Sequence, residues 1–251
     1  MLIDTHCHLN AKEFSSNLDY YVNNSFANEV MQIIVIGTNQ QDNKKAIEIA
    51  EKFNLYSTIG VHPSEVSTTK VSEIIPLLKH NRVVAIGECG IDLYWQKDNL
   101  DIQKQVFREQ IELSIEHDLP LVIHNRDSFY EIIEELKPYK GRVKGVFHCF
   151  TLGIKEAMIA IEYGFYLGIG GVITFKKSLE LQEVIKKIPL EYIVLETDAP
   201  YLAPTPKRGK QNEPAYLKYT ALFLADLLNI NYDELAQITT QNAKKLFNIE
   251  E

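Results

Sequence analysis

The chain has 251 residues, of which 45% are hydrophobic and 24% are charged, values typical of a globular protein with a sizeable core. Its formal net charge of −8 argues against a protein that coats duplex DNA, so any contact with nucleic acid has to be local. The sequence shows neither a secretory leader nor a run of about 18 apolar residues, and we therefore expect a cytoplasmic protein without a membrane segment.

Eight short apolar runs predict strands. Most of these runs are continuously apolar rather than alternating, which is typical of parallel strands that are buried on both faces. In chain order they are residues 1–4, 31–37, 55–61, 82–87, 119–124, 143–148, 165–171 and 191–196.

The segments between these runs have apolar residues at spacings of three and four, which predicts helices at 43–53, 101–117 and 128–139. Residues 215–248 predict two closing helices, and the Pro/Lys-rich stretch 202–214 predicts a loop. Strand–helix units that repeat in this way predict an α/β fold, a single (β/α)8 TIM-type barrel domain over residues 1–251 with C-terminal helices.

Ionisable side chains follow most of the predicted strands at their carboxyl ends. Five of the seven histidines are among them. Because the carboxyl ends of barrel strands converge on one face, these groups are expected to meet in one pocket. They are His6, His8, His62, Glu88, His124, His148 and Asp198.

Imidazole and carboxylate groups together suit divalent transition metals. A single histidine of this kind is more often hydrogen-bonded in a core, but burying several ionisable groups together is costly unless a metal compensates them. Glu88 has two oxygens and lies on a middle strand, so we expect it to bridge two cations of zinc, manganese or magnesium. The expected ligands are His6, His8, Glu88, His124, His148 and Asp198.

The sequence resembles the TatD family of metal-dependent deoxyribonucleases, within the amidohydrolase-like metal barrels. The resemblance is carried by "LIDTHCHLN" (2–10), "PLVIHNRDSFYE" (120–131) and "LETDAP" (195–200), with support from "GVHP" and "GECGID". Ser128 departs from the family, which usually has Ala or Thr there. The resemblance implies a TIM-like barrel that hydrolyses phosphodiester bonds in DNA. It also implies one cation on His6, His8, Glu88 and Asp198, and a second on Glu88, His124 and His148.

We expect Asp198 to act as the general base that takes a proton from the attacking water, with Glu88 as the second catalytic carboxylate. The acidic chain and the narrow barrel mouth favour exonuclease-like or single-strand activity. Two alternatives stay open: a binuclear-metal amidohydrolase, esterase or lactonase that acts on a small molecule, and a barrel that only binds a partner or nucleic acid. The sequence indicates no protein partner, and a monomer is the default expectation.

Four residues near the predicted pocket are candidates for substrate contact or support. Arg126 follows His124 by two residues and could bind a phosphate, or form a surface ion pair instead. His62 could contact substrate, ligate a metal or pack in the core, and Asp92 could order a ligand or the loop beside the pocket. Glu196, two residues before Asp198, is expected to orient a ligand.

Two exposed-looking segments could also contact nucleic acid. Lys207, Arg208 and Lys210 lie in the loop after the eighth strand and could track a nucleic-acid backbone, or be an ordinary solvated loop. Tyr94 and Trp95 follow the fourth strand, where an aromatic ring could stack on a base; for Trp95, core packing is the alternative.

The three cysteines each adjoin a candidate ligand. Because alternate residues of a strand face opposite sides, Cys7, Cys89 and Cys149 are expected to point away from the pocket and to pack as small buried residues. Their wide spacing also argues against a disulfide framework. By the same alternation, Asp4 should face the side of His6 and orient its ring.

Overall fold

The computed structural model describes residues 1–249. Its eight parallel strands follow one another in the order β1 to β8, and a bridge between Cys7 and Ala199 joins the last strand to the first. The strands are β1 Leu2–Cys7, β2 Val30–Val35, β3 Tyr56–Ile59, β4 Val83–Asp92, β5 Leu121–Arg126, β6 Gly145–Phe147, β7 Phe165–Ile169 and β8 Ile193–Leu195. The predicted parallel barrel is therefore confirmed.

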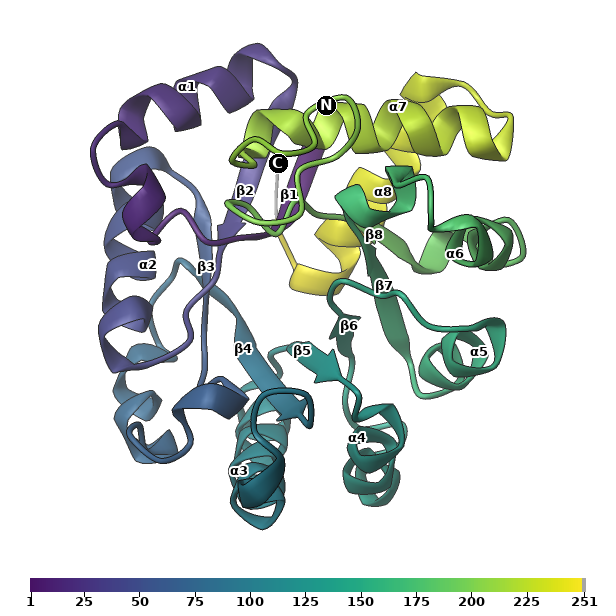
Figure 1. Ribbon diagram of the computed structural model, residues 1–251. Coiled ribbons are helices and arrows are strands. Elements are labelled where there is room, and N and C mark those ends of the chain that lie inside the picture. The colour runs from purple at the N-terminus through teal and green to yellow at the C-terminus, as the bar shows by residue number, and fades with distance from the viewer. Residues whose placement is uncertain (250–251) are drawn as a thin grey trace.

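Helices surround the strands, and the C-terminal helix α8 lies behind them in Figure 1. The α-helices are α1 Leu18–Ala27, α2 Gln40–Phe53, α3 Leu100–His117, α4 Phe129–Leu136, α5 Ile154–Glu162, α6 Leu179–Ile185, α7 Leu217–Leu228 and α8 Tyr232–Phe247. Both closing helices lie where they were expected. Within residues 1–249, no helix is long and apolar enough to cross a membrane.

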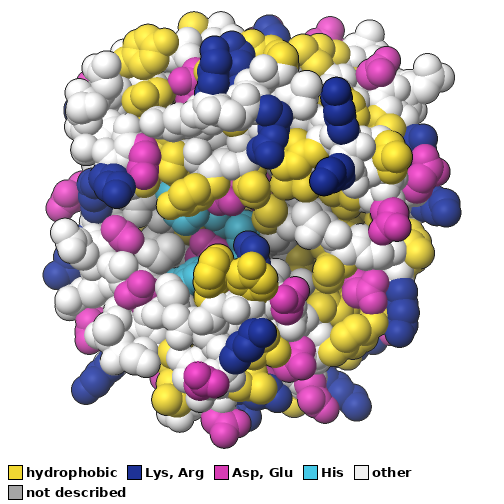
Figure 2. Space-filling view, in the orientation of Figure 1, with side chains coloured by type: hydrophobic (Ala, Val, Ile, Leu, Met, Phe, Trp, Pro, Cys, Tyr) yellow, Lys and Arg dark blue, Asp and Glu magenta, His cyan; other side chains and the backbone are white. Residues whose placement is uncertain are grey.

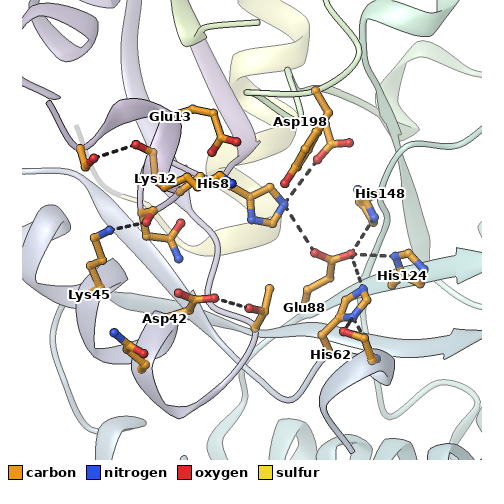
Figure 3. A pocket seen from close by; sticks show the side chains of 17 residues that line it. His8, Lys12, Glu13, Asp42, Lys45, His62, Glu88, His124, His148 and Asp198 are labelled. Atoms are coloured by element: carbon orange, nitrogen blue, oxygen red, sulfur yellow. Dashed lines mark hydrogen bonds and ion pairs between the residues drawn. The ribbon is translucent and has the colours of Figure 1, made fainter. Parts of the chain in front are cut away.

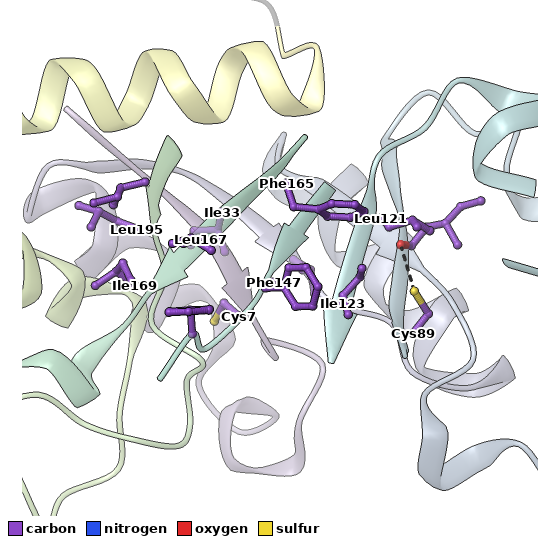
Figure 4. Packing of buried hydrophobic residues seen from close by; sticks show 14 of the residues in the cluster. Cys7, Ile33, Cys89, Leu121, Ile123, Phe147, Phe165, Leu167, Ile169 and Leu195 are labelled. Carbon is purple, nitrogen blue, oxygen red and sulfur yellow. Dashed lines mark hydrogen bonds between the residues drawn. The ribbon is translucent and has the colours of Figure 1, made fainter. Parts of the chain in front are cut away.

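The hydrophobic core has two parts. The larger part fills the space between the strands and the surrounding helices and includes Cys7, Cys89 and Phe147 (Figure 4). The smaller part fills the amino end of the barrel interior, where Val122 and Val146 belong to one apolar cluster with residues of α8 such as Phe247. The barrel is therefore closed by packing at one end and leaves its other end for polar groups.

The fourth strand is longer than its apolar run predicts. β4 continues through Glu88 to Asp92, and Gly90 and Asp92 pair with His124 and Arg126 of β5. The predicted end at residue 87 is wrong because "GECGID" carries glycines and charges, although it is fully buried in the sheet. Glu88 and His124 therefore project from within paired strands, which fixes their backbones more firmly than a loop would.

The expectation for the cysteines holds for two of them. Cys7 and Cys89 are buried among apolar side chains. Cys149 is only partly buried, because β6 ends at Phe147 and Cys149 adopts a left-handed φ of 48°. Strand alternation therefore does not apply to Cys149, and its expected role as a buried packing residue is wrong.

Candidate active site

Glu88 lies at the centre of the polar groups in the barrel mouth (Figure 3). Its Oε1 is 2.8 Å from Nδ1 of His124 and 2.9 Å from Nε2 of His148. Its Oε2 faces the other way, 3.5 Å from Nε2 of His6 and 3.8 Å from Nε2 of His8. Each carboxylate oxygen thus serves a different pair of histidines, although Glu88 itself is only 3% exposed.

Electrostatics keep Glu88 ionised in this buried position. Burial alone would raise its pKa, but the charge of His148 and the hydrogen bonds from His124 and His148 hold the pKa well below its usual range. Glu88 is therefore a carboxylate at neutral pH, with lone pairs available on both oxygens.

Asp198 completes the group on the Oε2 side. Its Oδ1 lies 3.4 Å from Nε2 of His8 and 3.7 Å from Nε2 of His6. Its backbone N–H donates to the His6 carbonyl over 2.8 Å, and its φ of 55° is left-handed. Burial would raise the pKa of Asp198, but the hydrogen bond from His8 and the nearby charge of His148 lower it below the ordinary value. Asp198 is therefore an ionised acceptor that the backbone holds in an unusual conformation.

The nitrogen atoms of this cluster converge as metal ligands do. Nε2 of His6 and Nε2 of His8 are only 3.2 Å apart. Burial and the neighbouring His148 lower the pKa of His6, which favours the neutral imidazole that a metal requires. Three groups of side chains have ligand atoms close enough for one ion, and they are His6–His8–Asp198, His62–Glu88–His124 and His6–His148–Glu196.

His62 also lies beside Glu88, and its hydrogen bonds determine which ring nitrogen carries the proton. Its Nδ1 accepts the backbone N–H of Ser64 over 3.1 Å and contacts the Ser64 hydroxyl at 2.8 Å. Burial lowers the pKa of His62 to about 4, so the ring is neutral and its remaining proton lies on Nε2. That nitrogen is 3.6 Å from Oε1 of Glu88. His62 can therefore donate a hydrogen bond into the pocket.

Two further carboxylates lie behind the histidines. Asp92 Oδ2 is 3.0 Å from Nε2 of His124, the nitrogen that faces away from Glu88. Glu196 Oε1 is 3.7 Å from Nδ1 of His148 and accepts the backbone N–H of Cys149 over 2.6 Å. A Cβ at position 168 would lie 2.2 Å from the Glu196 carboxylate, so Gly168 makes room for it. A carboxylate in the position of Asp92 fixes the orientation and tautomer of a ligating histidine, whereas Nδ1 of His148 has no hydrogen-bond partner within residues 1–249.

Asp4 has a different role from the one expected. Its carboxylate accepts the backbone N–H and the hydroxyl of Thr197 over 2.9 and 2.6 Å, and only the backbone N–H of His6, at 3.3 Å. Nδ1 of His6 has no hydrogen-bond partner within residues 1–249. The expectation that Asp4 orients the His6 ring is therefore wrong; Asp4 positions the backbone next to Asp198. Burial raises the pKa of Asp4 to about 8.

Buried amide side chains hold the loops that carry the site. Gln110 on α3 accepts from and donates to the backbone of Val61, directly before His62, over 2.8 and 3.1 Å. Gln103, also on α3, makes the same pair of bonds to the backbone of Asp92, over 2.8 and 3.2 Å. The helix thus fixes the loop after β3 and the end of β4 by bidentate hydrogen bonds. Their spacing of seven residues on one helix face could have been noticed in the sequence, but not their partners.

A pocket of about 830 Å³ opens beside Glu88. It extends from the histidine and carboxylate side chains around Glu88 toward the loops after β1, β2 and β3, where its lining includes Lys12, Lys45 and Asp42. Lys12 and Lys45 were missed by the sequence reasoning, which considered the ends of strands but not the first turns that follow them. Tyr201 lines the pocket on the side of His8.

The basic residues proposed as substrate contacts lie outside the lining of this pocket. Arg126 is exposed and places its guanidinium 4.5 Å from the ring centre of Tyr94. Within residues 1–249 it forms no ion pair with a carboxylate, so the surface ion pair considered for it is not found. Arg208 stacks over Phe175 at 3.9 Å.

The other basic residues of the loop after β8 divide into two kinds. Lys207 lies 5.0 Å above the ring of Tyr216 and is partly buried, whereas Lys210 is exposed. Trp95, on the loop after β4, is 70% exposed, so the alternative that it packs in the core is wrong.

Ser128, which stands where the family usually has Ala or Thr, forms hydrogen bonds that support the site. The Ser128 hydroxyl donates to the Ile91 carbonyl over 2.6 Å and also contacts the Asn125 side chain. It thereby joins the turn after β5 to the end of β4. A polar residue at this position supports the two strands that carry Glu88 and His124.

Comparison with known proteins agrees with this geometry. The family described as TatD related DNase matches residues 3–248. The metal-dependent hydrolase YabD of Bacillus subtilis is 42% identical over 99% of this chain and all of its own length, and YcfH of Escherichia coli is 32% identical over 99% and 96%. The names of both relatives describe them as uncharacterised.

Solved structures give the same result. YjjV, a TatD homologue of Escherichia coli, superposes with a TM-score of 0.94 at 29% identity and covers 99% of this chain and 98% of its own. Dihydroorotase of Campylobacter jejuni, at 16% identity and a TM-score of 0.66, shares the fold alone. The chain therefore belongs to the TatD family of metal-dependent hydrolases, which has the amidohydrolase-like barrel fold.

Proposed function

We propose that the protein hydrolyses phosphodiester bonds in DNA, at strand ends or in single strands, with two divalent cations bound in the barrel mouth. The observation that carries this proposal is the division of the Glu88 carboxylate between two sets of nitrogen ligands. One cation would be held by His6, His8, Glu88 and Asp198, and the other by Glu88, His124 and His148. When bound, such ions lower the pKa of water and offset the negative charge on phosphoryl oxygens.

The chain's own residues have separate tasks in this reaction. Asp198 is ionised and beside His8, so it can hold the proton that the attacking water loses. His62 directs its Nε2 proton toward the pocket and can donate it in a hydrogen bond to a phosphoryl oxygen. Asp92 keeps His124 in orientation through its contact with Nε2, whereas Glu196 lies 3.7 Å from Nδ1 of His148 and acts on this ring through its charge.

The family name and the shape of the protein support DNA as the substrate. The matching family is described as a DNase. The net charge of −8 disfavours wrapping of a duplex, and the pocket lies in a recessed barrel mouth, which a strand end reaches more readily than an intact duplex does.

The test is digestion of single-stranded DNA labelled at either its 3′ or its 5′ end, with Mg²⁺, Mn²⁺ or Zn²⁺. The expected result is metal-dependent shortening of the strand from one end, abolished in Glu88→Gln. Equal digestion by the wild type and by Glu88→Gln would contradict the site. Failure of the wild type with every metal would contradict the substrate.

A small amide, ester or lactone substrate is the second candidate. The mixed charge of the pocket favours it, since Glu13 and Asp42 line the pocket together with Lys12 and Lys45. The same residues would hold cations that can polarise a carbonyl oxygen as well as a phosphoryl oxygen. A panel of phosphodiesters, amides and lactones would separate the two candidates, because the first predicts turnover of the phosphodiesters alone.

A further inference from the structure

We propose that Trp95 is a stacking platform for a base of single-stranded nucleic acid while a neighbouring phosphodiester of the same strand reaches Glu88. This inference rests on the proposed nuclease function, because it identifies the part of the substrate that the protein holds. It is carried by the exposure of Trp95, by the rigidity of its turn and by the connection of that turn to His124.

Trp95 is unusually exposed to solvent for a tryptophan. It is the only tryptophan in the chain, and it is 70% exposed. The adjacent Tyr94 is 48% exposed, and the two rings stand nearly perpendicular, at 83°, with centroids 4.6 Å apart. Large aromatic side chains are mostly buried unless a partner covers them. The Trp95 ring therefore presents an apolar surface that is open to solvent within the described chain.

The turn that presents Trp95 is held in place. Oδ1 of Asp92 accepts the backbone N–H groups of Tyr94 and Trp95 over 2.9 and 2.8 Å. Gln103 of α3 bonds the backbone of Asp92 and donates to the Gln96 carbonyl over 2.7 Å. Both sides of the turn are thus anchored to α3. A ring on such a turn binds with a smaller loss of conformational entropy than a ring on a mobile loop.

The same carboxylate connects the turn to the candidate active site. Oδ2 of Asp92 contacts Nε2 of His124 at 3.0 Å, and Nδ1 of His124 contacts Glu88 at 2.8 Å. The Asp92 side chain therefore links the backbone N–H of Trp95 directly to His124, a candidate metal ligand. A base on Trp95 would lie at a fixed offset from Glu88, so that the strand enters the site in a defined register.

The chemistry of the patch matches a nucleotide. The guanidinium of Arg126 covers the ring of Tyr94 at 4.5 Å and leaves Trp95 as the open ring. Since Arg126 forms no ion pair with a carboxylate within residues 1–249, its N–H donors are available to a phosphate. A flat ring beside a guanidinium is the combination that binds base and phosphate in single strands. A stable protein partner would need a broader apolar surface than two rings.

The shape of the molecular face that carries the site, and the side chains around it, support this proposal. Figure 2 shows histidine side chains at the floor of a hollow, with hydrophobic and basic side chains around its rim. Tyr201, which is 56% exposed, lies beside His8 with its ring 6.1 Å from the His8 ring, whereas the turn of Trp95 is connected to His124 at the other oxygen of Glu88. A strand that crosses the mouth would pass an aromatic side chain on each side of Glu88.

The first experiment uses Trp95 as its own probe, because its fluorescence is the only tryptophan signal of the protein. The full-length protein with Mg²⁺ is titrated with a phosphorothioate strand of about 12 nucleotides, which resists cleavage and spans a typical single-strand site. A fully abasic strand of equal length and charge is the matched ligand. The proposal predicts quenching by the strand with bases and little change with the abasic strand. Equal signals from both strands would overturn it.

The second experiment measures binding of the same strand by fluorescence polarisation. Trp95→Ala is expected to weaken binding about tenfold, and Trp95→Phe by much less, since a smaller ring still stacks. Met31→Ala, which removes a 42% exposed apolar side chain at the opposite end of the barrel, should leave binding unchanged. Unchanged binding by Trp95→Ala, or a loss that is equal for the abasic strand, would contradict the proposal.

These results are separable from the proposed function. Quenching and base-dependent binding without any strand cleavage would refute the nuclease reaction and leave the platform in place. Cleavage that depends on Glu88, together with binding that ignores Trp95, would refute the platform and leave the nuclease reaction in place.

Discussion

The two ends of the barrel interior are built on the same strands but have opposite chemistry. At the amino end, Val122 of β5 and Val146 of β6 pack with Phe247 of α8 in an apolar cluster. Only two residues further along the chain in each case, His124 and His148 face the Glu88 carboxylate. Apolar burial stabilises the first end, at roughly 25 cal/mol per Å² of surface removed from water. The second end gathers ionisable groups at a cost in free energy.

This difference separates stability from chemistry within one core. At the apolar end, stability depends only on side chains of complementary shape. At the polar end, the neighbouring groups change the pKa values of the ionisable side chains. Burial and the charge of His148 lower the pKa of His6, while Glu88 and Glu196 raise the pKa of His148 against the effect of burial. Changes at the polar end should therefore affect the reaction, and changes at the apolar end should affect folding.

The largest effect is expected at the polar end. Glu88→Gln removes the shared charge while keeping the shape, so strand cleavage should fall by about a thousandfold or more, with the fold retained. Single-turnover cleavage and circular dichroism measure the two properties. Glu116→Gln, on the exposed face of α3, is the matched control and should cleave like the wild type. A Glu88→Gln variant with a tenth of normal activity would contradict the role of Glu88.

At the apolar end, Phe247→Ala is expected to lower the free energy of unfolding by about 3–5 kcal/mol, because it leaves a cavity between α8 and the strands. Urea denaturation measures this loss. The protein that remains folded should keep its cleavage rate, since Phe247 lies at the opposite end of the interior from Glu88. A loss of cleavage rate without a loss of stability would contradict the statement that the apolar end affects folding alone.

Asp4 gives a pH test of the polar end. Burial raises its pKa from the ordinary value of 3.8 to about 8, so the folded state binds this proton more tightly than the unfolded state. Its contribution to stability is complete below pH 3.8 and is lost as the pH rises toward 8. The metal-free wild type should therefore lose stability relative to Asp4→Asn across this window, by at most about 1.4 kcal/mol per pH unit. Parallel stability curves, measured in urea with a chelator, would show that Asp4 does not titrate there.

The smallest effect is expected at the loop after β8. Lys207 and Arg208 lie over aromatic rings, whereas Lys210 is exposed and has no aromatic ring beside it among the described residues. Lys210→Ala should weaken strand binding less than about threefold and leave stability within about 0.5 kcal/mol. Binding measured at several salt concentrations checks this. A drop of about 0.7 in the salt slope would show that Lys210 does contact a phosphate.

Much of the fold could be predicted from the sequence because its physical cause is local. Continuous apolar runs mark buried parallel strands, and the convergence of their carboxyl ends brings His6 and Asp198 together although they are far apart in the chain. The true end of β4 could not be predicted, since local polarity conceals the pairing of Asp92 with Arg126.

The remaining details of the site depend on tertiary contacts. The contact of Asp92 with His124 follows from the register of β4 against β5, and the placement of Lys45 in the pocket wall follows from the packing of α2. The partial exposure of Cys149 follows from a left-handed backbone that a strand pattern does not show. Side-chain contacts between elements are thus the part that the sequence pattern leaves open.

The central claim is that Glu88 joins two cation sites. Its most direct test is an anomalous difference map from crystals of the wild-type protein grown with Zn²⁺ or Mn²⁺. The account predicts two peaks, one between Glu88, His6 and His8 and one between Glu88, His124 and His148. A map without a peak beside Glu88, or with a single peak that contacts neither of its oxygens, would contradict it.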